Sequence, residues 1–174
     1  QDLSNFEGKR IRYAGAVWQK VIEALGASPV PVPPAETADA MGKGIVDGAT
    51  FPFEATMPFD LAPVSEYTLT PGIAGATFSV IIGDHAYMRL SGEHKALIDE
   101  TTGPDRAADF GALWDKGEVR GRAYMEEGGV EVVALNEVAL EQLRTKLNDV
   151  VTNFIEDADA KGIPASAFVD AYSK

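Results

Sequence analysis

The sequence predicts an α/β protein built on a parallel sheet. In the first 66 residues, short apolar runs bounded by glycine or proline alternate with segments whose apolar residues recur at helical spacing. The order strand, helix, strand, helix, strand, helix is typical of right-handed βαβ crossovers. With 174 residues and 45% hydrophobic content, the chain is long and apolar enough to bury a core.

The first predicted strand and helix flank a glycine turn. Residues 10–13 alternate basic and apolar side chains, which predicts a strand, and Gly15 interrupts the pattern. A helix is predicted up to Gly26 from apolar residues at helical spacing, namely Val17, Trp18, Val21, Ile22 and Leu25. Residues 29–33 interleave valines with prolines and predict a short strand at a sheet edge or the end of a strand, because proline cannot donate to a ladder.

Three further segments complete this first unit. Residues 36–41 predict a short helix. Apolar residues after two glycines predict a second buried strand that ends at Pro52: Ile45, Val46 and Ala49. Residues 53–61 predict a helical turn.

The middle of the chain predicts a change of direction. Residues 68–75 are turn-rich and predict a connection. Residues 76–83 then predict a strand buried on both faces, because four large apolar residues gather there: Phe78, Val80, Ile81 and Ile82. We expect this strand to need a partner that the chain lacks, from a further domain or a second copy.

The second half predicts mainly helices. Residues 84–128 are mostly helical with a break at Gly103 and Pro104, and residues 130–135 predict a strand. A long helix over residues 136–161, packed on the sheet, is predicted from one apolar face: Leu140, Leu143, Leu147, Val150, Val151, Phe154 and Ile155. Residues 164–172 add a short amphipathic tail.

Charge and composition exclude several classes of function. The net charge of −12 argues against nucleic-acid partners and membrane surfaces, since both require clustered Lys and Arg. The chain has no Cys, which removes disulfides, thiolate nucleophiles and Cys-based zinc sites. No apolar run is long enough for direct membrane insertion. The chain opens without Met or a signal peptide, and we expect a product from which the signal peptide has been removed.

Two strand-to-helix junctions hold the candidate binding residues. At the first, Arg12 leaves the strand three residues before Gly15, and the start of a helix follows. A guanidinium can grip a carboxylate through two bonds, and a helix amino terminus favours anions. The alternative interpretation is a strand-end Arg paired with one of the 27 acidic residues.

The second junction is aromatic. Phe51 and Phe53 surround Pro52 at the carboxyl end of the predicted strand and could line the same crevice as Arg12. They could equally pack beneath the next helix, because aromatic residues are buried for packing far more often than for binding. Trp18 leaves the same two alternatives open.

The remaining chemical groups predict no catalytic set. His85 and His94, the only histidines, lie in polar segments, and we expect solvated roles for both and no metal site or cofactor. No nucleophile-elbow or zinc-protease motif occurs in the sequence.

Four segments resemble the extracytoplasmic binding proteins of tripartite ATP-independent periplasmic (TRAP) transporters. The similarity covers the chain from end to end, through residues 7–12 (EGKRIR), 24–31 (ALGASPVP), 44–49 (GIVDGA) and 128–133 (GGVEVV). It implies a two-domain clamshell from which most of the first domain is absent. Residues 1–70 and 116–174 would form the second domain, and residues 71–115 would be a hinge and crossover that contributes to the first domain.

The resemblance also implies ligand residues. The Arg at the position of Arg12 clamps the ligand carboxylate in this family, and the position of Gly15 lines the cleft. Many members carry Asn where this chain has Phe51, and an aromatic residue where it has Pro34. Both departures remove features typical of sugar-acid binders.

The prediction for function is therefore binding without chemistry. We expect a periplasmic solute-binding protein for a TRAP transporter that captures an apolar or aromatic monocarboxylate and delivers it to the membrane permease subunits. Arg12 would fix the carboxylate and Gly15 would allow close approach, while Phe51, Phe53 and Trp18 would enclose the apolar body. The alternatives are a small α/β lyase or hydrolase with Glu54 or His85 as base, and a ligand-sensing domain of a signalling protein.

Overall fold

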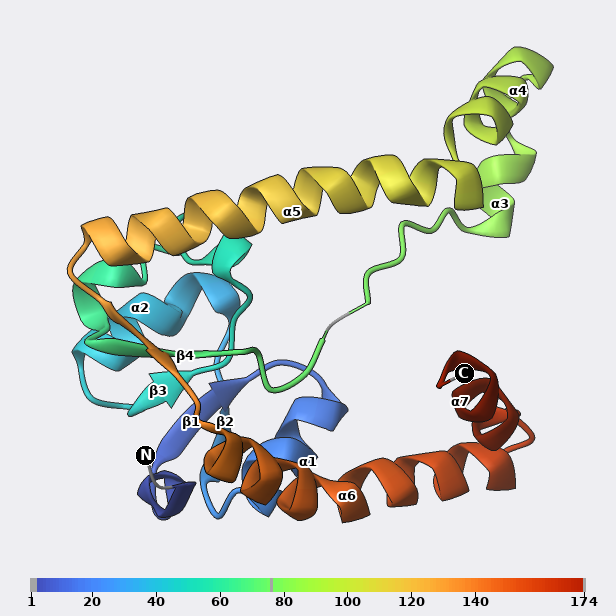
Figure 1. Ribbon diagram of the computed structural model, residues 1–174. Helices are drawn as coiled ribbons and strands as arrows, with labels where there is room; N and C mark the ends of the chain where they lie inside the picture. The colour runs from blue at the N-terminus through green and yellow to red at the C-terminus, as the bar shows by residue number, and fades with distance from the viewer. Residues whose placement is uncertain (1–2, 76, 174) are drawn as a thin grey trace.

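The first unit is a three-stranded parallel sheet with its connecting helices (Figure 1). The computed structural model describes residues 3–75 and 77–173. Strand β1 (Arg10–Tyr13) is central and runs parallel to both β2 (Ser28–Pro31) and β3 (Gly48–Ala49). Helix α1 (Ala16–Ala24), the 3-10 helix η2 (Pro34–Glu36) and α2 (Thr37–Gly42) connect them. The predicted parallel βαβ order is confirmed, and β2 lies at one edge of the sheet, a position that its prolines predict.

Helix α1 follows its predicted apolar spacing. Val21, Ile22 and Leu25 are buried, which anchors the helix to the sheet and its neighbours. Gly26, at φ 85°, ends the helix in a conformation that residues with a side chain rarely adopt.

A second sheet contains two parallel strands, β4 (Tyr67–Thr70) and β5 (Glu131–Ala134). The prediction of a turn-rich connection over residues 68–75 is therefore wrong for residues 68–70. The register pairs Leu69 with Val133, and the Leu135 N–H donates to the Thr70 carbonyl at 2.8 Å. The strand forms because β5 arrives from far along the chain, and local sequence does not encode that pairing.

The predicted strand over residues 76–83 is also wrong, with Ala76 outside the described residues. Residues 77–83 form no strand or helix, and their large side chains lie exposed. Val80 is 97% exposed and Ile81 88%. A strand needs a neighbour to satisfy its N–H and C=O groups, and none of the described residues supplies one here. The apolar pattern is present, but among the described residues no strand pairs with it, and Phe78 instead stacks on Trp114 at 5.4 Å.

Three helices lie beyond this segment. Helices α3 (Asp84–Met88) and α4 (Gly92–Thr101) contain no buried residue and lie away from both sheets, at the far end of α5 (Pro104–Glu127) (Figure 1). Gly103, at φ 94°, precedes Pro104 at the first helical position, so the predicted break is the start of α5.

Helix α6 (Glu137–Ala160) confirms the predicted long helix. The Asn136 side chain caps it by accepting from the Ala139 N–H at 2.9 Å. Its first half packs on α1 and η1 (Leu3–Phe6), around buried Ala139 and Leu143. The contact is therefore mainly with helices and not, as predicted, with the parallel sheet.

The second half of the apolar face of α6 is partly exposed. Val151 is 54% exposed and Phe154 38%. Helix α7 (Ala165–Tyr172) follows as predicted, and Phe168 and Tyr172 stack on each other at its surface. None of the described helices has the length and apolar character of a membrane span.

A second core cluster lies where α5 meets the segment between the sheets. Leu61, Ala62, Met125 and Val130 are buried together. That segment forms two short 3-10 helices, η3 (Phe53–Ala55) and η4 (Ala62–Val64), where the sequence predicts one helical turn over residues 53–61.

An exposed ion pair ties β1 to the start of β3. The Arg10 guanidinium donates to both carboxylate oxygens of Asp47, at 2.7 and 3.0 Å, and the Arg10 N–H donates at 2.8 Å. The side-chain bond from Arg10, followed by its backbone bond, lowers the pKa of Asp47 from 3.8 to about 2.

The Asp47→Asn variant is expected to be less stable than the parent at pH values above about 2, where the Asp47 carboxylate of the folded parent is charged. Because the folded-state pKa is depressed, the stabilisation is fully present above pH 3.8 and is lost as pH falls through about 2. Urea midpoints of both proteins across this range would measure it. A difference that stays constant down to the lowest pH would show that the charged carboxylate is not its source.

Candidate functional site

Arg12 lies at the carboxyl end of the central strand and joins all three strands. Its Nε donates to the Val32 carbonyl at 2.9 Å, just after β2, and its Nη1 donates to the Thr50 carbonyl at 3.0 Å, just after β3. The residue is only 2% exposed. Backbone carbonyls therefore fix the guanidinium at the edge of the sheet where ligands bind in parallel α/β folds.

The Arg12 charge has no acidic partner among the residues that the structure describes. The ion pairs of this part of the chain involve other cations, and all lie near the surface. Burial lowers the pKa of Arg12, since desolvation penalises the charged form. The alternative of a strand-end Arg paired with an acid is wrong within the described residues. A buried charge compensated only by carbonyls favours an anion as its further partner.

Phe51 lies against the guanidinium. The Arg12 Cζ is 4.1 Å from the centroid of the Phe51 ring, a cation–π contact. The same ring is 5.6 Å from that of Phe59 and packs against the second core cluster. The structure therefore shows that Phe51 packs against the second core cluster and also contacts Arg12, while its role in lining a ligand crevice stays a prediction.

Phe53 and Trp18 lie in other surroundings. Phe53 begins η3, where its backbone meets α5, and its side chain packs on the second core cluster. Trp18 packs on the first cluster, between α1 and α6. Neither makes a described contact with Arg12. Of the three aromatic candidates, the structure therefore brings only Phe51 to Arg12.

Gly15 occupies the turn between β1 and α1. It has φ 86° and is the residue before the first turn of the helix. An added Cβ would meet no atom within 4 Å, so backbone conformation and not crowding favours glycine here. The exposed backbone leaves room for another molecule three residues after Arg12.

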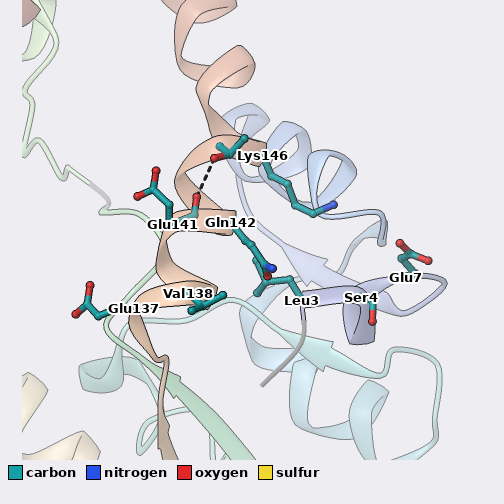
Figure 2. A pocket seen from close by; sticks show the side chains of 9 residues that line it. Leu3, Ser4, Glu7, Glu137, Val138, Glu141, Gln142 and Lys146 are labelled. Carbon is teal, nitrogen blue, oxygen red and sulfur yellow. Dashed lines mark hydrogen bonds between the residues drawn. The ribbon is translucent and has the colours of Figure 1, made fainter.

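The hollow in Figure 2 is a different place. It lies between η1 and α6 and has a volume of about 720 Å³. Its lining residues include three acids, Glu7, Glu137 and Glu141, and a single cation, Lys146. None of the predicted site residues lines it. An acidic rim does not suit a carboxylate, so this groove is not the predicted site.

The groups considered for catalysis do not converge. Glu54 lies in η3, while His85 is exposed on α3 at the far end of α5 (Figure 1). His94 is exposed on α4. Within residues 3–75 and 77–173, no three His, Asp or Glu side chains are placed to hold a metal ion.

Sequence reasoning missed the groups that fix this site. The carbonyls of Val32 and Thr50 hold Arg12, and no side-chain pattern marks a carbonyl as an acceptor. It also missed Glu118, whose carboxylate accepts from the N–H groups of Phe53 and Glu54, both at 3.2 Å. The glycines at 117 and 121, four residues apart on one helix face, were the available signal of close approach.

Two solved structures share this fold over nearly the whole chain. A TRAP periplasmic solute-binding protein from Bordetella bronchiseptica, with bound (R)- and (S)-mandelate, is 28% identical, with a TM-score of 0.86. The alignment covers 96% of this chain and 54% of that protein. A marine-metagenome TRAP solute-binding protein specific for aromatic acid ligands, in complex with 3-hydroxybenzoate, is 26% identical, with a TM-score of 0.83 and coverage of 98% and 54%.

The fold extends to more distant proteins. A TRAP solute-binding protein from Rhodoferax ferrireducens with copurified benzoate has a TM-score of 0.83 at 20% identity, over 95% of this chain and 53% of that protein. The chain thus spans about half the length of the proteins that it matches. The sequence profile of bacterial extracellular solute-binding protein family 7 matches residues 1–157. The fold and this match lead to one conclusion: the chain belongs to bacterial extracellular solute-binding protein family 7.

Proposed function

We propose that this chain is the carboxyl-terminal half of a periplasmic solute-binding protein that captures an apolar or aromatic monocarboxylate for a TRAP transporter. The observation that carries the proposal is Arg12, a buried guanidinium at the carboxyl end of the central strand without an acidic partner among the described residues. A ligand carboxylate would supply the missing negative charge.

The donors of Arg12 define how the acid would bind. Nε and one N–H of Nη1 are used by the carbonyls of Val32 and Thr50. Nη2 makes no hydrogen bond to a described residue, and it can pair with the remaining N–H of Nη1 as a two-pronged donor. One face of the guanidinium is covered by Phe51. The carboxylate would therefore approach end-on, with its body beside the Phe51 ring.

The relatives support an aromatic acid as the ligand class. The Bordetella protein holds mandelate, and the marine protein is specific for aromatic acid ligands. Both ligands combine one carboxylate with one ring. A site that presents a guanidinium beside a phenyl ring suits the same combination, with Gly15 allowing close approach and Phe53 and Trp18 supporting the walls from their core positions.

The amount of exposed surface supports a two-domain protein. The chain exposes 11929 Å², whereas a compact monomer of 18.5 kDa would expose roughly 8,200 Å². Large apolar side chains are exposed on residues 77–114 and on the second half of α6, among them Val80, Ile81, Leu113 and Val151. We propose that residues 1–70 and 116–174 form the second domain of a clamshell. Residues 71–115 would cross to a first domain, which would cover the apolar segment over residues 77–82.

Capture and delivery would follow from closure of the two domains. Hinge closure around a ligand is the usual device of such proteins, and the closed form would present a new surface to the permease subunits. The protein would act in the periplasm and would bind its ligand without performing chemistry on it.

Calorimetric titration of the complete protein with a panel of monocarboxylates tests this function. The panel pairs acids that differ in one group, such as mandelate and lactate, which share a 2-hydroxy carboxylate and differ in a phenyl or methyl group. We expect saturable binding of ring-bearing acids and weaker binding of lactate. If no monocarboxylate binds, the proposed function is wrong.

Replacement of Phe51 by Asn is expected to change the selectivity. Acids with aromatic or branched tails should bind less tightly by about 1 to 3 kcal/mol, the scale of a lost apolar contact, while lactate should be spared. Phe168→Asn, which changes a 67% exposed aromatic on α7, is the matched control. Equal losses for mandelate and lactate would show that Phe51 does not contact the apolar body.

A further inference from the structure

Helix α5 holds η3 through one carboxylate and the peptide backbone. Glu118 Oε2 accepts from the Phe53 N–H and Oε1 from the Glu54 N–H, both at 3.2 Å. These N–H groups open η3 and have no partner within it. Each oxygen of a single side chain therefore fixes one residue, and the negative charge suits this end of the turn.

Two glycines let α5 approach this closely. A Cβ on Gly117 would come within 2.9 Å of the Glu54 Cβ, and one on Gly121 would overlap the Phe53 carbonyl. The buried Thr56 hydroxyl lies within hydrogen-bonding distance of the carbonyls of both Phe53 and Gly121, at 2.7 and 3.1 Å. We call this set of contacts the α5–η3 clasp: Gly117, Glu118 and Gly121 of α5 with Phe53, Glu54 and Thr56.

The clasp is joined to Arg12 by a stiff segment. Pro52, with its ring-restricted φ of −69°, links Phe53 to Phe51. Phe51 covers the Arg12 guanidinium, and the preceding Thr50 carbonyl accepts from it. Four consecutive residues are thus held by Arg12 at one end and by α5 at the other. A displacement of α5 must move the ring that lies on Arg12.

We propose that Glu118 is a positioning residue for the binding site, because the α5–η3 clasp sets where the Phe51 ring lies over Arg12. This inference rests on the proposed function. Glu118 has no described contact with Arg12 or with the Phe51 ring, and it acts through the backbone N–H of Phe53. The other end of α5 carries α3 and α4, so the clasp also connects the ring beside the ligand to the part of the chain that would belong to the first domain (Figure 1).

Calorimetry with mandelate and lactate on the complete protein distinguishes positioning from general support. In Glu118→Gln the mandelate affinity is expected to fall about 3- to 30-fold, while the lactate affinity stays within about 2-fold. A purely structural role would change both or neither, because both acids use the same carboxylate clamp. Glu127→Gln, an exposed acid on the same helix, is the charge control and should leave both affinities unchanged.

A double-mutant cycle gives a second criterion. In the Phe51→Asn background, Glu118→Gln should have no further effect on mandelate, since the ring it positions is gone. Additive losses in the double variant would overturn the inference, as would equal losses for mandelate and lactate. Failure of the proposed function is distinguishable, because it appears in the parent protein as absence of binding to any acid of the panel.

Gly121→Ala tests the α5–η3 clasp by a second route that does not depend on Glu118→Gln. The added methyl group would displace η3 from α5, so mandelate affinity should fall by at least as much as in Glu118→Gln. Gly111→Ala is the matched control on the same helix, because its Cβ would meet nothing within 4 Å. Urea unfolding of each variant confirms that titrations use folded protein. Mandelate affinity unchanged in a folded Gly121→Ala variant would contradict the clasp as the positioning element.

Discussion

Replacement of Arg12 by Ala in the complete protein is expected to weaken binding of its best monocarboxylate by about 2 to 5 kcal/mol, roughly 30- to 5,000-fold. The bound carboxylate would remain desolvated after losing its main partner. Arg12→Lys should recover only part of the loss, because a point charge cannot reproduce two-pronged geometry. Calorimetry or competition with a tighter ligand measures the difference.

Arg10→Ala is the matched control for this experiment. Arg10 lies on the same strand two residues earlier, but it pairs with Asp47 at the surface, and its removal should leave affinity unchanged. Arg12 also donates to two carbonyls, so its variants need unfolding curves beside the titrations. A folded Arg12→Ala variant that binds as tightly as the parent would place the anchor elsewhere, without affecting the family assignment.

The helices α3 and α4 are expected to open far more readily than the sheet when this chain is studied alone. Neither contains a buried residue, and residues 77–83 that lead to them are exposed. Local opening free energy follows buried contacts, so amides of α4 should exchange with deuterium at least about 100-fold faster than those of β1. Hydrogen exchange followed by mass spectrometry gives both rates in one experiment.

The same measurement on the complete protein tests the proposed domain arrangement. If a first domain covers residues 77–82, amides of this segment and of α4 should become protected, while those of β1 change little. Helix α1, in which Ile22 is only 2% exposed, is an internal reference in both samples. Rapid exchange of residues 77–101 in the complete protein would contradict the crossover to a first domain.

Much of the fold followed from local patterns. The apolar spacing of α1, the break before α5 and the face of α6 each depend on residues close in sequence, and the structure confirms these elements. Local patterns gave the wrong structure for strand β4 and for residues 77–83. Residues 68–70 contain turn-forming neighbours yet form a strand, because β5 pairs with them. Residues 77–83 have a strand-like composition and form none, because no described residue pairs with them.

For the candidate site, too, local sequence indicated some features and only long-range packing decided the others. Charge type and position at the strand end made Arg12 a candidate, and the family resemblance implied its role as the carboxylate clamp. Its lack of an acidic partner among the described residues is compatible with that role. Sequence could not separate Phe51 from Phe53 and Trp18, since all three are aromatic residues near a strand end or helix start. Only packing assigned Phe51 to Arg12, Phe53 to α5 and Trp18 to the first core cluster.

The sequence by itself determined the α/β class, the parallel crossover order, the candidate anchor Arg12 and the family resemblance, because periodicity, charge and short motifs are local properties. The tertiary structure alone decided which strands pair and which aromatic ring covers the Arg12 guanidinium. It also decided that Glu118 binds the backbone of Phe53 and Glu54. These depend on contacts between residues distant in sequence, such as Arg12 with Thr50 and Phe53 with Glu118. These contacts stabilise the fold only when separate elements pack together, so no single segment of the sequence encodes them.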